Sequence, residues 1–133
     1  PRTKRLLIAL KETSGEVKRY VYFYDFRKKI AWKGLVLSPQ KLEQEAGLTG
    51  KDAMLKPSGV AVHPQRGEMY VLAAEGAKLL VLDRMGLVRS VARLDPKIFR
   101  QPEGICFAPD GTLFIASEGK GEKGYLLKFA ENR

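Results

Sequence analysis

The chain has 133 residues, 44% of them hydrophobic, and carries a formal net charge of +9. This composition predicts one globular domain and argues against a disordered chain, and no apolar run is long enough to span a membrane. The basic residues are scattered and no nucleic-acid-binding motif accompanies them. We therefore do not expect nucleic acid as a partner, and attraction to an acidic ligand or an anionic surface explains the charge better.

The first third of the chain predicts strands followed by one helix. Apolar, aromatic and β-branched residues gather in three segments separated by polar turns, which is typical of short strands. Ser38 suits the N-cap of a helix, Pro39 its first turn and Gly47 the position after its end, so a short helix is expected near 39–46. The three strands are expected at 5–11, 20–25 and 30–37.

A repeat organises the rest of the chain. The eight residues from Pro57 to Pro64 match the eight from Pro102 to Pro109 position by position, at an interval of 45 residues. A period of this length with several strands per unit is the signature of a β-propeller blade. The strands of the two units are expected at 59–62, 68–73, 77–83, 87–94, 104–107, 112–117 and 125–129.

The units predict an all-β propeller arc of about three blades, over 5–37, 57–94 and 102–129, with the short helix between the first two. The middle unit has four strands, whereas the first lacks an opening strand and the third lacks a closing one. An open arc would leave sheet faces unburied. We therefore predict a fragment of a longer propeller, its remaining blades supplied by another chain, a second copy or a removed segment.

Strand geometry predicts where a binding site would lie. The first strand of a blade runs beside the central channel and the second runs back, so the start of one and the end of the other share a face. Glu103 begins a first strand and Glu118 follows a second strand, while Glu75 and Glu12 recur at the place of Glu118. Ser58 replaces Glu103 in the middle unit. Carboxylates of successive blades are thus expected to converge on one channel mouth.

The segment from Pro102 to Glu118 resembles the C-terminal signature of the SdiA-regulated family of bacterial β-propellers, which is related to NHL-repeat propellers. The segment from Pro57 to Pro64 resembles the preceding blade of that family. The resemblance implies a five- or six-bladed ring in a periplasmic or cell-envelope protein. It also implies a calcium site near the propeller axis.

Calcium takes six to eight oxygen ligands, which a ring of carboxylates can supply. Glu103 and Glu118 are accordingly the predicted metal ligands, and Ser58, Glu75 and Glu12 are further candidate ligand-binding residues of the channel face. In the alternative interpretation, Glu103 and Glu118 are solvated loop residues.

Motifs for catalysis are missing from the sequence. His63 is the only histidine and precedes Pro64 in a turn, and no nucleophile elbow or phosphate-binding loop is present. We predict no catalytic or cofactor-binding residue, and hence a non-enzymatic propeller that binds a small-molecule or protein ligand on its channel face, with Ca²⁺ as the candidate cofactor. A calcium-dependent hydrolase of the lactonase, esterase or phytase type is the alternative.

Four further residues are expected to be structural. Asp25, Asp83 and Asp110 recur in turns, where aspartate accepts hydrogen bonds from nearby backbone N–H groups. Cys106, the one cysteine, lies in a strand pattern and is predicted to be a buried core thiol.

Overall fold

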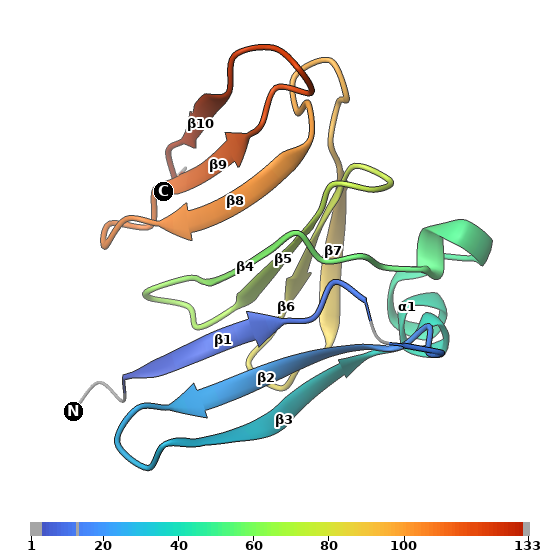
Figure 1. The fold of residues 1–133 in the computed structure, drawn as a ribbon, viewed down its shortest axis with the longest axis vertical. Helices are drawn as coiled ribbons and strands as arrows, with labels where there is room; N and C mark the ends of the chain where they lie inside the picture. The colour runs from blue at the N-terminus through green and yellow to red at the C-terminus, as the bar shows by residue number, and fades with distance from the viewer. Residues whose placement is uncertain (1–3, 13, 132–133) are drawn as a thin grey trace.

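The computed structural model describes residues 4–12 and 14–131, and it is mostly β with one short α-helix. Its strands form three antiparallel sheets, each built from strands that are consecutive in sequence (Figure 1). The first sheet contains β1 (Arg5–Ala9), β2 (Arg19–Asp25) and β3 (Ile30–Leu37). The second contains β4 (Gly59–Val62), β5 (Met69–Ala73), β6 (Lys78–Leu82) and β7 (Val88–Arg93), and the third contains β8 (Pro102–Phe107), β9 (Leu113–Ser117) and β10 (Tyr125–Phe129).

The helix α1 (Pro39–Ala46) lies where the sequence predicts it. Ser38 Oγ accepts a hydrogen bond from the Lys41 N–H at 3.1 Å, and Gly47 ends the helix in the left-handed conformation, with φ of 65°. Glu45 accepts a hydrogen bond from the Val88 N–H at 2.8 Å, which fixes the helix against the start of β7. A short 3₁₀ turn, η1 (Gly50–Ala53), follows the helix.

The three turn aspartates have the structural role that the sequence predicts. Each carboxylate accepts a hydrogen bond from at least one backbone N–H within four residues. The N–H of Lys28 holds the pKa of Asp25 below its usual value, because that bond favours the charged carboxylate.

The second sheet lies between the other two and is buried on both faces (Figure 1). Alternate residues of β5 point to opposite faces: Val71 joins a core with the first sheet and α1, and Leu72 joins a core with the third sheet. This arrangement explains why β5 and β6 are apolar in succession rather than alternating with polar residues.

The first and third sheets each expose an apolar outer face. Leu7 packs inward, so its neighbours Leu6 and Ile8 point outward and are 46% and 41% exposed. On β10, Leu126 is 62% exposed. Cys106 is exposed on β8, so the prediction of a buried thiol is wrong. The strand alternation that buries Ile105 turns Cys106 to the outer face, which no other described element covers.

Among the residues that the structure describes, no helix has both the length and the apolar content needed to cross a membrane.

Candidate functional site

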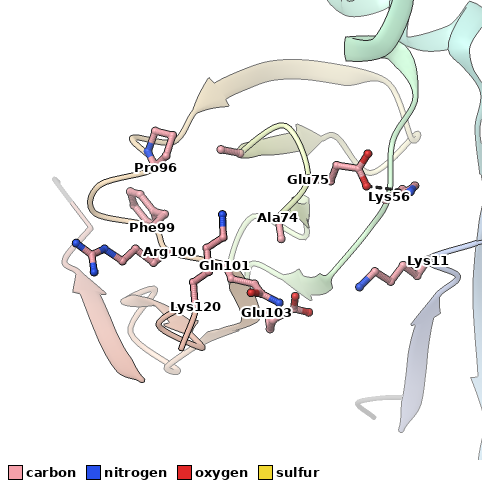
Figure 2. A pocket seen from close by; sticks show the side chains of 11 residues that line it. Lys11, Lys56, Ala74, Glu75, Pro96, Phe99, Arg100, Gln101, Glu103 and Lys120 are labelled. Atoms are coloured by element: carbon pink, nitrogen blue, oxygen red, sulfur yellow. Dashed lines mark ion pairs between the residues drawn. The ribbon is translucent and has the colours of Figure 1, made fainter. Parts of the chain in front are cut away.

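One end of the three sheets carries a cavity of about 320 Å³, which we call the mouth cavity (Figure 2). It lies where β5 ends and β8 begins, and residues that follow β1 and precede β4 complete its wall. The structure therefore brings the ends of strands from all three sheets to one hollow. The lining residues are Lys11, Lys56, Ala74, Glu75, Ala77, Pro96, Phe99, Arg100, Gln101, Glu103 and Lys120.

Three of the candidate carboxylates lie at this end of the molecule. Glu75 is 2.9 Å from Lys56 Nζ, and Glu12 approaches the same nitrogen at 3.6 Å. Glu103, the second residue of β8, is half-buried and lines the same cavity. The strand-end geometry expected from the sequence thus brings Glu12, Glu75 and Glu103 together.

Glu118 and Ser58 take other positions. Glu118 is exposed and does not line the mouth cavity, although its N–H donates a hydrogen bond to the Gln101 carbonyl at 3.0 Å. Ser58 Oγ donates to the Pro102 carbonyl at 2.8 Å and accepts from the Ala74 N–H at 3.2 Å. The Ser58 hydroxyl therefore joins the second sheet to the third rather than facing the cavity.

The cavity wall carries more positive than negative charge. Its basic residues are Lys11, Lys56, Arg100 and Lys120, and its acidic residues are Glu75 and Glu103. The carboxylate of Glu75 raises the pKa of Lys56, and the Lys56 ammonium in turn lowers the pKa of Glu75. Both groups of this pair are therefore charged at neutral pH.

Calcium does not fit the residues described at this mouth. No group of three or more His, Cys, Asp and Glu side chains within 4–12 and 14–131 is placed to hold a metal ion. The Glu75 carboxylate is already occupied by Lys56, and calcium needs six to eight oxygens. A calcium site that uses Glu103 or Glu118 stays a prediction, and it would need oxygen ligands from outside these residues.

The backbone of the mouth cavity is locally strained. Four described non-glycine residues have a positive φ, and three of them, Ala77, Gln101 and Lys120, line this cavity. The left-handed conformation costs a residue with a side chain about 1–2 kcal/mol. Such strain gathers at binding and catalytic sites more often than elsewhere, so its concentration here supports a functional role.

Sequence reasoning missed the cationic half of this site. Lys11 and Lys120 were not singled out, because a lysine in a polar loop is usually solvated. One signal was available in the repeat, where Glu75-Gly76-Ala77 and Glu118-Gly119-Lys120 share a Glu-Gly turn. In both turns the glycine and the residue after it are left-handed, and the last residue lines the cavity.

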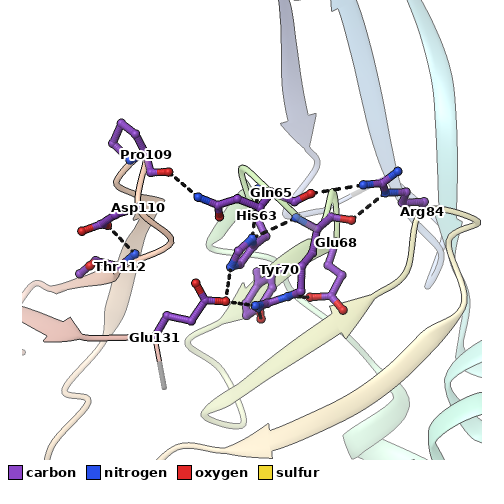
Figure 3. A network of polar contacts seen from close by, with 10 residues as sticks. His63, Gln65, Glu68, Tyr70, Arg84, Pro109, Asp110, Thr112 and Glu131 are labelled. Atoms are coloured by element: carbon purple, nitrogen blue, oxygen red, sulfur yellow. Dashed lines mark hydrogen bonds and ion pairs between the residues drawn. The ribbon is translucent and has the colours of Figure 1, made fainter. Parts of the chain in front are cut away.

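The opposite end of the sheets holds a polar network (Figure 3). His63 is buried, and its Nδ1 accepts hydrogen bonds from the N–H groups of Gln65 and Arg66 at 3.3 and 3.2 Å. Its Nε2 lies 3.4 Å from Glu131, which also pairs with the Arg66 guanidinium. Gln65 donates to the Pro109 carbonyl. These contacts give His63 a structural role, fixing the turn after β4 against the third sheet and the segment after β10.

Solved structures offer little guidance on function. A fungal alcohol oxidase of the AA5 family, solved in complex with copper, matches with a TM-score of 0.42 and 17% sequence identity, over 95% of this chain and 26% of the oxidase. The chain spans about a quarter of the length of that enzyme. A likeness this weak carries no argument about chemistry.

No curated protein matches the sequence. A family model, described as SdiA-regulated, matches residues 25–120. This span is most of the chain and contains the repeated Pro57 and Pro102 segments that line up in the second and third sheets. The chain therefore belongs to the SdiA-regulated family.

Proposed function

We propose that this chain is an arc of a β-propeller that binds a ligand at its channel mouth without transforming it. The observation that carries the proposal is the mouth cavity, where strand ends from all three sheets meet. Its volume of about 320 Å³ is at the lower end of the range of small-molecule sites. Pockets at the ends of packed strands are common places for ligands.

Binding is favoured over hydrolysis by the chemistry of the wall. The residues that line the cavity include no serine, threonine, cysteine or histidine, so the described wall offers neither a hydroxyl or thiol nucleophile nor an imidazole base. A calcium-dependent hydrolase would need both a filled oxygen cage and a base from elsewhere.

The open outer faces support a larger ring. Leu6, Ile8 and Leu126 are apolar side chains at positions where a neighbouring blade would cover them. In Figure 1, β1 runs in the direction of β5 and β9, the second strands of their sheets, so the first sheet has no counterpart of β4 and β8. We propose a five- or six-bladed ring completed by another chain, a second copy or a further segment.

The ring is testable through Cys106. In this chain alone the thiol is exposed, and we expect a thiol reagent to modify it quickly without denaturant. In the closed ring the next blade would cover this face and slow the modification strongly. Native mass spectrometry of the same sample shows whether a second polypeptide or copy is present, and equal reactivity in open and closed forms would contradict the proposal.

The function is testable by ¹H–¹⁵N NMR of the labelled chain, titrated in turn with small organic anions, cations and neutral sugars. We expect shifts that centre on the mouth cavity and no turnover of an aryl ester, with or without calcium. Calcium-dependent ester hydrolysis that requires Glu103 would favour the hydrolase instead.

Following the family, we also propose that the protein works in the periplasm or cell envelope, which fractionation of the tagged protein would check.

A further inference from the structure

Three lysines from three different loops face the mouth cavity (Figure 2). Lys11 follows β1, Lys56 precedes β4 and Lys120 follows β9. Of these, Lys56 is paired with Glu75 and Glu12. No ion pair between residues of the described chain involves Lys11 or Lys120, so neither ammonium is held by a carboxylate of these residues within 4.0 Å.

The acidic residues of the wall do not cancel these charges. Among the lining residues, Glu75 pairs with Lys56, and Glu103 is the one further carboxylate that opposes Lys11 and Lys120. Glu12, which also approaches Lys56, lies outside the lining of the cavity. Arg100 pairs with Glu122, and in Figure 2 its guanidinium points away from the lysines. The side chains that line the cavity therefore carry a net positive charge, and a concave wall strengthens its field relative to open water.

One wall of the cavity is apolar. Phe99 and Pro96 form it, and the Phe99 ring is held in place by stacking on Phe129, with ring centroids 5.9 Å apart. A ligand that combines a compact apolar group with a charged group would use both kinds of wall. A bare inorganic ion would use only the lysines.

The position of Lys120 is fixed by its backbone. Its φ is 52°, and the preceding Gly119 N–H donates a hydrogen bond to the Arg100 carbonyl at 3.2 Å. Gln101, opposite, has a φ of 54° and accepts the Glu118 N–H. These bonds hold the loop after β9 against the start of β8, so that the Lys120 backbone lies at the cavity before any ligand binds.

We propose that the mouth cavity binds a small organic anion, with one carboxylate or phosphate group held between Lys11 and Lys120 and a compact apolar group against Phe99. This inference rests on the proposed function and names its ligand class. The ligand that we propose for this mouth is thus an anion, whereas the sequence analysis predicted a calcium ion.

Isothermal titration calorimetry of the chain tests the inference with four probes: phenyl phosphate, benzoate, benzyl alcohol and calcium chloride. We expect one or both organic anions to bind and benzyl alcohol to bind far more weakly, because it has the ring without the charge. Comparing the affinities of phenyl phosphate and benzoate shows whether the cavity prefers a phosphate or a carboxylate group. Binding should weaken as salt rises, since the lysines are partly exposed to solvent.

Variants locate the site. Lys11→Ala and Lys120→Ala should each weaken anion binding about tenfold, as expected for loss of one charge-assisted hydrogen bond. Lys123→Ala, an exposed lysine three residues away and outside the cavity wall, is the matched control and should have no effect. Glu103→Gln should strengthen anion binding, because it removes the nearest unpaired negative charge.

The outcomes separate this inference from the function on which it rests. If benzyl alcohol binds as well as benzoate, or if the lysine variants bind unchanged, the cavity is a ligand site but the anion inference is wrong. If calcium binds and Glu103→Gln abolishes its binding, the anion inference is wrong and the calcium prediction gains support. If no probe binds, the inference fails, and only the broader NMR titration can still support a ligand at this mouth.

Discussion

The two ends of the sheets differ in how their polar groups are used. At the end that carries His63, buried and charged groups are joined to one another, and even the imidazole accepts two backbone hydrogen bonds. At the mouth end, Lys11 and Lys120 face a cavity without an ion pair in the described chain, and the backbone beside them is strained. The charged groups at the His63 end thus have partners within the chain, whereas two lysines at the mouth end face the cavity without an ion pair among the described residues.

The largest loss of stability is expected from a substitution at the end of the sheets that carries His63. His63→Ala removes the acceptor of two N–H groups and the packing against Phe107, whose ring centroid is 4.9 Å away. We expect the free energy of unfolding to fall by about 3 kcal/mol, because two backbone donors lose their acceptor and a cavity forms where the buried imidazole was. Urea denaturation measures it. A loss below about 0.5 kcal/mol, the size expected at a surface site, would remove the distinction between the ends.

Truncating the mouth lysines should have almost no effect on stability. For Lys120→Ala we expect the free energy of unfolding to stay within about 0.5 kcal/mol of the parent, since the side chain is exposed and unpaired among the described residues. The same urea titration checks this. A loss comparable to that of His63→Ala would mean that Lys120 is part of the structural framework, and its assignment to binding would be wrong.

Relieving strain at the mouth should raise stability. Gln101→Gly removes the cost of a left-handed side-chain-bearing residue, and after the entropy cost of glycine we expect a gain of about 0.5 kcal/mol. Gln101→Ala is the control, because alanine keeps the strained φ and should give no gain. If both variants behave alike in thermal unfolding, the backbone at this position is not strained.

A small, pH-dependent effect on stability is expected from the ion pair at the cavity edge. Lys56 holds the pKa of Glu75 below its usual value, so this carboxylate stabilises the fold above its unfolded pKa and loses that contribution as pH falls through the folded pKa. Glu75→Gln should therefore be slightly less stable than the parent at pH 7, and the gap should narrow as the pH falls towards and through the folded pKa of Glu75, for example at pH 3. Urea titrations at both pH values measure the gap, with exposed Glu118→Gln as the control. A gap that is as large at pH 3 as at pH 7 would contradict the pairing.

Much of the fold could be predicted because its signals are local. The repeated Pro57 and Pro102 segments marked equivalent strands, Ser38 and Gly47 marked the ends of α1, and Asp25 marked a turn. Each of these residues acts within a few positions of itself, so one sequence is enough to interpret it. The exposure of Cys106 could not be predicted in this way, because it depends on whether another sheet covers β8.

The site was predicted only in part, for reasons of register. Glu75 and Glu118 were treated as equivalent, but Glu75 stands two residues beyond the end of β5 and Glu118 only one beyond the end of β9. The two carboxylates therefore stand at different places relative to the strand ends, and Glu75 lines the cavity whereas Glu118 does not. Lys11 and Lys120 could not be recognised as site residues from the sequence, because they line one cavity only when separate loops come together in the fold.

The most direct test is a crystal structure of the chain grown with both calcium and selenate, with anomalous difference maps recorded at wavelengths that distinguish the two elements. We predict a selenate peak between Lys11 and Lys120 and no calcium peak on Glu103. A calcium peak on Glu103, with selenate absent from the lysines, would contradict the central claim that this mouth selects an anion.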